Sequence, residues 1–148
     1  MKIRLSFLLM GISAIRERSN RFVSNLDMFI AEALDEKGQA FADINKMQML
    51  ESKRSDEATI TPMYSPKYAK RKGFPNPNLK LKGDFQADMF FQTDGREFFI
   101  TSSDVKMPWL VDRYSEKIFG IAKSKAHIGQ AIALSSLARV YNKFVLNG

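Results

Sequence analysis

The chain contains no cysteine and only one histidine, His127, among its 148 residues. The lack of thiols excludes a disulfide framework, thiolate metal sites and a cysteine nucleophile. A zinc site would need carboxylates for every ligand other than His127, which argues against zinc. Glycine-rich phosphate loops are missing too, because Gly73, Gly83, Gly95 and Gly120 are isolated and none precedes a Lys-Ser or Lys-Thr pair. We therefore expect no metal and no cofactor.

Patterns typical of catalysis are equally scarce. His127 has no nucleophile beside it in the sequence, so we expect it to be solvated or to cap a helix. No other set of acid, base and nucleophile stands out, and we expect that the protein is not an enzyme. A hydrolase that acts through His127 is kept as a third alternative, behind the two functions given below.

Long apolar runs are also absent. Residues 1–15 begin with basic side chains and continue with apolar ones, as a signal peptide does, but Arg16-Glu17-Arg18 follows where small residues would mark a cleavage site. The apolar-rich residues 5–15 are too few to cross a bilayer, which needs roughly 20 residues. We expect neither a cleaved signal nor a contact with membrane.

The first ten residues predict a half-buried strand, because apolar and polar side chains alternate. The apolar positions are Ile3, Leu5, Phe7 and Leu9. Leu8 and Met10 interrupt the alternation, so a helix that begins here is the alternative.

The net charge of +7 comes almost entirely from one segment. Residues 1–60 contain nine basic and nine acidic side chains, and residues 84–148 contain eight and seven. Residues 61–83 contain six basic side chains, no acidic one and four of the five prolines. Because the prolines argue against regular structure, we expect a basic, proline-rich arm or loop over residues 61–83 within a single domain, 1–148.

Basic and aromatic side chains are interleaved in this arm. Such a combination neutralises phosphates and stacks on bases, and it suits the acidic surface of a protein partner equally well. A charge run of this kind is also typical of a solvated loop. The residues predicted to contact a partner or a polyanion are Lys67, Lys70, Arg71, Lys72, Lys80, Lys82, Tyr64, Tyr68 and Phe74.

The strongest periodic pattern lies between Phe22 and Met47. At 100° per residue, ten apolar side chains of this stretch fall within a sector of about 120°. The stripe keeps its phase across Lys37-Gly38, where a break would otherwise be expected. We expect one helix from about Ser19 to about Lys53, roughly 50 Å long, with Lys37-Gly38 as the place for any bend. A helix longer than its own domain indicates packing against another molecule.

Residues 79–103 predict a sheet. Thr93-Asp94-Gly95-Arg96 contains the Asp-Gly pair that favours a two-residue type I′ turn. That turn pairs residues whose numbers add to 189, for example Phe91 with Phe98. One face of the hairpin then collects the side chains of Phe85, Ala87, Met89, Phe91, Phe98 and Ile100, and the other face carries Phe90 and Phe99 among polar residues.

A closing helix is predicted to about Leu146, with Ser124 as its N-cap. A short helix or turn over residues 110–119 precedes it and ends at Gly120. Ile128 and Ile132 lie on the otherwise polar side of the closing helix, which indicates either a second partner or a contact within the fold. The predicted fold class is α+β: a long N-terminal helix and a C-terminal helix packed on a small antiparallel sheet with a Phe-rich hairpin.

Two runs in the second half carry a family resemblance. Residues 78–85, NLKLKGDF, and residues 114–121, YSEKIFGI, lie on either side of the predicted hairpin. With the long first helix, the basic link and the closing helix, they resemble the small tail-completion and head-to-tail connector (neck) proteins of tailed bacteriophages. In that family a Leu-Thr-Gly-like turn precedes the sheet, and a Phe-Leu-Gly-Leu-like turn leads into the last helix. Here Lys82 stands in place of the threonine, and residues 118–121 approximate the second turn.

The resemblance implies a structural virion protein, assembled in the host cytoplasm, that forms a homo-oligomeric ring at the junction of capsid and tail. Its partners would be other neck, portal or tail proteins, with non-specific DNA contact in the lumen as an addition. It does not distinguish a neck protein from a tail terminator. The alternative function is a nucleic-acid-binding module that uses the basic residues of the 61–83 segment.

Overall fold

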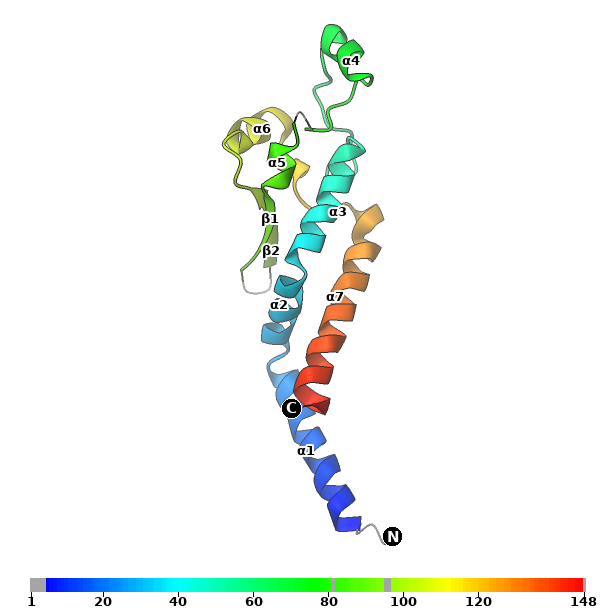
Figure 1. Ribbon diagram of the computed structural model, residues 1–148, viewed down its shortest axis with the longest axis vertical. Coiled ribbons are helices and arrows are strands. Elements are labelled where there is room, and N and C mark those ends of the chain that lie inside the picture. The colour runs from blue at the N-terminus through cyan, green and yellow to red at the C-terminus, as the bar shows by residue number, and fades with distance from the viewer. Residues whose placement is uncertain (1–4, 81, 95–96, 148) are drawn as a thin grey trace.

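Three consecutive helices form a nearly continuous spine along the long axis of the molecule (Figure 1). The computed structural model describes residues 5–80, 82–94 and 97–147. The spine consists of α1 (Leu5–Ser24), α2 (Leu26–Glu36) and α3 (Gly38–Leu50). The other elements are α4 (Pro66–Lys72), α5 (Asp84–Ala87), β1 (Met89–Asp94), β2 (Glu97–Ser102), α6 (Met107–Tyr114), η1 (Glu116–Ile118), η2 (Lys123–Lys125), α7 (Ala126–Tyr141) and η3 (Asn142–Leu146). The fold is a mostly helical α+β arrangement with an antiparallel hairpin against the helices, as predicted.

The long helix predicted from about Ser19 to about Lys53 is present as a spine, but it begins earlier, at Leu5, and it is not one helix. It is interrupted at Lys37, the place predicted for any bend, and also at Asn25, whose side-chain amide donates to the carbonyl of Arg21 at 2.9 Å. The strand predicted in the first ten residues is wrong from Leu5 onward, where α1 begins, and residues 1–4 lie outside the described part of the chain. A strand needs a neighbour to pair its backbone groups, whereas a helix satisfies them internally. The helix alternative is therefore the correct one.

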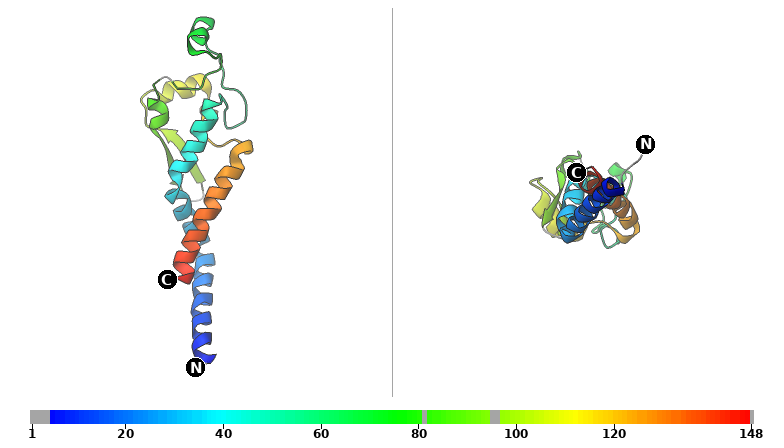
Figure 2. Two further views of the ribbon diagram at one scale, coloured as in Figure 1. Left: turned by 45° about the vertical axis from the view of Figure 1, so that its right-hand side comes forward. Right: turned by 90° about the horizontal axis from the view of Figure 1, so that it is seen from below.

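The C-terminal helix runs back along the spine. α7 lies antiparallel to α2 and α3, and the chain ends beside the junction of α1 and α2 (Figures 1 and 2). The rings of Phe22 and Phe29 stack there at 4.5 Å, and Phe144 lies 4.7 Å from Phe29. The predicted cap of this helix is wrong: Ser124 lies within η2, and its backbone N–H donates to Glu57 at 2.7 Å. Lys125 stands at the cap position, and its side chain makes no capping hydrogen bond.

The hairpin lies on the opposite side of α2 and α3 from α7 (Figures 1 and 2). Its predicted register is wrong, because Phe91 pairs with Ile100 and Asp94 pairs with Glu97, so that paired numbers add to 191. The connection is therefore residues 95–96, which lie outside the described residues, as does the type I′ turn predicted there. A register shift of two residues keeps every side chain on its predicted face.

The inner face of the hairpin packs on the spine. Phe91 stacks on Phe41 of α3 at 5.3 Å, and Met89 and Ile100 are buried. The prediction of sheet in the segment before β1 is wrong, because residues 84–87 form the helical turn α5. Gly83 precedes α5 with a left-handed φ of 100°, a conformation that redirects the chain into the turn. Ile128 and Ile132, left open above, pack against this same core within the fold.

Two buried amides of α3 hold the segment that leads into the last helix. Asn45 donates to the carbonyl of Ile118 at 2.9 Å and accepts from the N–H of Gly120 at 3.1 Å. Gln48 donates to the carbonyl of Gly120 at 3.2 Å and accepts from the N–H of Ala122 at 2.7 Å. Because three residues separate them, both amides lie on one face of α3. Their hydrogen bonds satisfy the backbone of this extended segment, which has no neighbouring strand to pair with in the described part of the chain.

The arm, residues 61–83, leaves the far end of the spine and returns to it (Figure 1). Its base is closed by Tyr64, whose N–H donates to the carbonyl of Pro75 at 3.0 Å. The expectation of no regular structure is wrong for α4, which Ser65 caps by accepting from the N–H of Tyr68 at 3.4 Å. Proline in the first turn and a left-handed Gly73 after the last turn are favourable helix ends. These signals outweigh the proline content.

Candidate functional site

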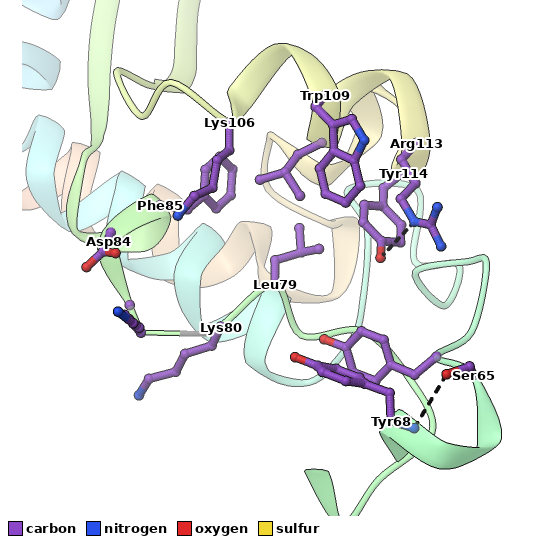
Figure 3. Close-up of a pocket in the computed structure, with 14 residues that line it drawn as sticks. Ser65, Tyr68, Leu79, Lys80, Asp84, Phe85, Lys106, Trp109, Arg113 and Tyr114 are labelled. Carbon is purple, nitrogen blue, oxygen red and sulfur yellow. Dashed lines mark hydrogen bonds between the residues drawn. The ribbon is translucent and has the colours of Figure 1, made fainter. Parts of the chain in front are cut away.

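The arm and α6 enclose a groove with a volume of about 500 Å³ (Figure 3). Trp109 and Tyr114 of α6 face Tyr68 of α4 across it, and Leu79 lies between them (Figure 3). The volume lies within the range of roughly 300–1,000 Å³ that is typical of ligand sites. The groove is lined by Tyr64, Ser65, Tyr68, Leu79, Lys80, Lys82, Gly83, Asp84, Phe85, Lys106, Trp109, Leu110, Arg113 and Tyr114.

Aromatic rings form most of the apolar wall of the groove. Tyr64 and Tyr68 meet edge to face with ring centres 4.8 Å apart. Trp109, the only tryptophan of the chain, exposes 58% of its surface. A large exposed indole beside two phenol rings is typical of a surface that binds an apolar or aromatic group of another molecule.

Four basic side chains surround this aromatic wall, and they are the source of its positive potential. They are Lys80 and Lys82 of the arm, Lys106 beside α6 and Arg113 within it, against one carboxylate, Asp84. Among the residues that the structure describes, no carboxylate forms an ion pair with any of the four cations. The groove therefore favours an anionic ligand with an apolar component.

Arg113 is fixed by its own helix. Its guanidinium carbon lies 5.6 Å from the Trp109 ring centre and 5.5 Å from that of Tyr114. Its Nε also donates to the Tyr114 hydroxyl at 3.3 Å. The cation–π contacts orient the cation along the rim without neutralising it.

Burial raises the pKa of the Tyr64 phenol above its usual value. Tyr64 therefore remains neutral at physiological pH, and its ring contributes to the apolar wall without adding negative charge. A ligand that approaches this part of the groove meets a hydroxyl group and an aromatic edge.

The nine residues predicted from the sequence are divided between the groove and the outer side of the arm. Tyr64, Tyr68, Lys80 and Lys82 line the groove. The other five are outside it and are Lys67, Lys70, Arg71, Lys72 and Phe74.

Four of the five outer residues belong to α4, and the fifth, Phe74, follows it. The Arg71 guanidinium lies 4.6 Å from the Tyr68 ring centre, on which it stacks. Lys72 donates to the carbonyl of Lys80, which ties α4 to the returning segment of the arm. Phe74 lies 6.3 Å from Tyr64. Lys67 and Lys70 are exposed.

The α6 side of the groove was missed by the sequence analysis. Lys106, Trp109, Arg113 and Tyr114 complete the site, although none of them belongs to the arm. One signal was present: Trp109 and Arg113 are four residues apart, a spacing at which two helical side chains meet. Nothing in the sequence placed that pair opposite Tyr68.

No other part of the described chain offers a better site. A smaller cavity of about 220 Å³ lies beside Gln48 and Lys125, but the ion pair of Lys125 with Glu51 at 2.8 Å lies in it. His127 is exposed at the start of α7. The described residues contain no group of three or more histidine and acidic side chains placed to hold a metal ion. Among their helices, none has both the length and the apolar character that a membrane crossing requires.

No protein-family model, curated protein or solved structure matches this chain.

Proposed function

We propose that the protein is a structural virion protein of a tailed phage, a ring-forming subunit at the head-tail junction that acts by protein-protein assembly. Tail completion, connector and neck roles all fit this description. The observation that carries the proposal is α1, which projects from the body (Figures 1 and 2) and carries apolar side chains that the described part of the chain leaves exposed.

The projecting helix needs a partner. In the described part of the chain, the contacts of α1 with the body lie in its last turns: Arg18 donates to the carbonyl of Val145 at 3.1 Å, and Phe22 is buried. Further toward the N-terminus, Ile12 exposes 56% and Ile15 42% of their surface. An unsupported helix of about 12–15 residues is marginal in water, so packing against another molecule would stabilise it.

The family resemblance supports the same proposal. Six residues of its first run line the groove: Leu79, Lys80, Lys82, Gly83, Asp84 and Phe85. Its second run, residues 114–121, contains most of the segment held by Asn45 and Gln48. Both runs therefore occupy positions that the fold depends on. A ring closes through heterologous contacts, in which one surface of a subunit meets a different surface of the next. An elongated subunit with binding surfaces at both ends suits that geometry, with portal, neck or tail proteins as further partners in the virion.

Light scattering and negative-stain electron microscopy of the purified protein test the proposal, together with mass spectrometry of purified phage particles. We expect closed rings, and peptides of this chain among the virion proteins. A monodisperse monomer that is absent from particles and does not join them would overturn the proposal.

The alternative is a nucleic-acid-binding module. Arg71 stacked on Tyr68, with Lys67 and Lys70 exposed on the same short helix, supports it. It predicts affinity for DNA or RNA that falls steeply with salt. Replacing all six basic residues of the arm with glutamine would abolish that affinity. Binding that ignores both salt and the substitutions would remove this alternative.

A further inference from the structure

The hairpin presents an exposed aromatic pair on the face that turns away from the spine. Phe90 exposes 39% and Phe99 49% of their surface. Phe90 pairs with Thr101 and Phe99 with Gln92, so the two rings are diagonal neighbours on one face. Phenylalanines that a fold leaves in solvent next to each other are typical of an interaction surface.

Acidic side chains continue this face toward the free end of the hairpin. Asp94 and Glu97 are directly paired, and the alternation of a strand places them on the same side as Phe90 and Phe99. Residues 88–99 contain three carboxylates and one arginine. This outer face, defined by Phe90, Gln92, Asp94, Glu97, Phe99 and Thr101, is therefore apolar at its centre and acidic at its end.

The groove has the complementary pattern. It is aromatic within, through Trp109 and the tyrosines, and basic at the rim, through Lys80 and Lys106. Its volume of about 500 Å³ is enough for two phenyl rings. Aromatic groups prefer edge-to-face or offset contacts, which the perpendicular rings of Tyr64 and Tyr68 offer.

We propose that the outer face of the hairpin of one copy docks into the groove of the next copy of this chain. Phe90 and Phe99 fill the groove, while Asp94 and Glu97 meet Lys80 and Lys106 at its rim. This inference names a contact of the proposed ring and rests on that function.

The hairpin cannot fill the groove of its own chain. β1 begins directly after α5, beside the groove, and the hairpin then runs away from α6 toward the middle of the spine (Figure 1). The strands therefore point away from the groove of their own chain (Figure 1). Because hairpin and groove are different surfaces, the contact is heterologous and repeats from copy to copy until a ring closes.

The test uses two variants of the full chain. The hairpin variant is Phe90→Ser/Phe99→Ser, and the groove variant is Lys80→Glu/Lys106→Glu. The hairpin variant keeps an intact groove, and the groove variant keeps an intact hairpin. We expect the wild type to form oligomers and each variant alone to associate at least about tenfold more weakly. An equimolar mixture has one working interface per pair, so we expect it to stop at a dimer.

The emission of Trp109 follows occupation of the groove, because it is the only tryptophan. We expect it to shift as the wild type associates and as the two variants are mixed. Lys67→Glu/Lys70→Glu changes the charge of the arm outside the groove and is expected to assemble as the wild type does. If the hairpin variant loses its helical circular dichroism, Asp94→Lys/Glu97→Lys replaces it.

Oligomers that persist in both variants would overturn the contact and leave the proposed ring function standing. A wild-type protein that stays monomeric would overturn the contact. If the protein is also absent from virions, the proposed function is overturned as well. Emission of Trp109 that shifts with an added oligothymidylate, and not with protein concentration, would overturn the contact in favour of a polyanion ligand.

Discussion

Gly38 lies directly against the ring of Phe91, and a Cβ atom at Gly38 would come within 2.7 Å of Cδ1 of that ring. The glycine sits where α2 gives way to α3, and Phe91 is the hairpin residue that stacks on Phe41. The close approach explains why glycine occupies the first turn of a spine helix. It lets the hairpin pack on the spine.

Gly38→Ala is expected to lower the free energy of unfolding by about 1–3 kcal/mol, as overpacking does, although alanine favours helix by about 1 kcal/mol. Urea denaturation measures the change. Gly11→Ala is the matched control, because nothing lies within 4 Å of a Cβ at that helical position. The control should be neutral or stabilising, and a stabilised Gly38→Ala variant would contradict the contact.

Asn45→Leu is expected to lower the free energy of unfolding by at least about 2 kcal/mol, because it leaves the carbonyl of Ile118 and the N–H of Gly120 buried without partners. Hydrogen exchange at the amide of Gly120 should quicken in the same variant. Gln39→Ala, which removes one exposed hydrogen bond to Asp43, should change stability by less than about 0.5 kcal/mol. Equal effects of the two substitutions would contradict the role given to Asn45.

Asp56 is expected to titrate near pH 2. Hydrogen bonds from Arg54 and then from Lys117 lower its pKa from 3.8 to about 2. Since the folded pKa is the lower one, the stabilisation by Asp56 is fully present above pH 3.8 and is lost as the pH falls toward 2. Carboxyl NMR measures the midpoint, and Lys117→Met should raise it. A midpoint at the ordinary value in the wild type would contradict these contacts.

Ile12→Ser/Ile15→Ser is expected to weaken assembly without changing the fold, because both side chains are exposed on the projecting part of α1. Light scattering reports assembly, and circular dichroism reports the fold. Ser13→Ala, between them, is a control that leaves the apolar side chains in place. Rings of unchanged size and stability in the double variant would contradict the role of α1.

The parts of the fold that depend on residues close together in the sequence were predicted well. The apolar stripe gave the spine, although it predicted one helix with at most a bend at Lys37, where the structure has two helices. Strand alternation gave the inner face with Met89, Phe91 and Ile100. The Asp-Gly pair, in contrast, led to a register that is two residues off, because Asp94 takes part in the last pair. The prediction of which side chains lie on each face of the hairpin is still correct, because side chains along a strand alternate with a period of two residues.

Contacts between distant segments were not accessible in this way. The sequence analysis found the tyrosines and lysines of the arm, but not that Trp109 and Arg113 lie opposite them. The same holds for Asn45, whose partners are more than seventy residues away. The periodic pattern of the sequence does not mark such groups. A buried polar side chain only interrupts an apolar stripe, and its role becomes clear when its hydrogen-bond partner is known.

The hydrogen bond between Tyr64 and Pro75 makes the ten residues between them a compact loop whose two ends are held together. Insertions or deletions inside it change the loop-closure entropy only slowly, and they leave the body where it is. Selection can therefore rewrite α4 for a new partner while the spine, the hairpin and the groove wall on α6 keep their positions.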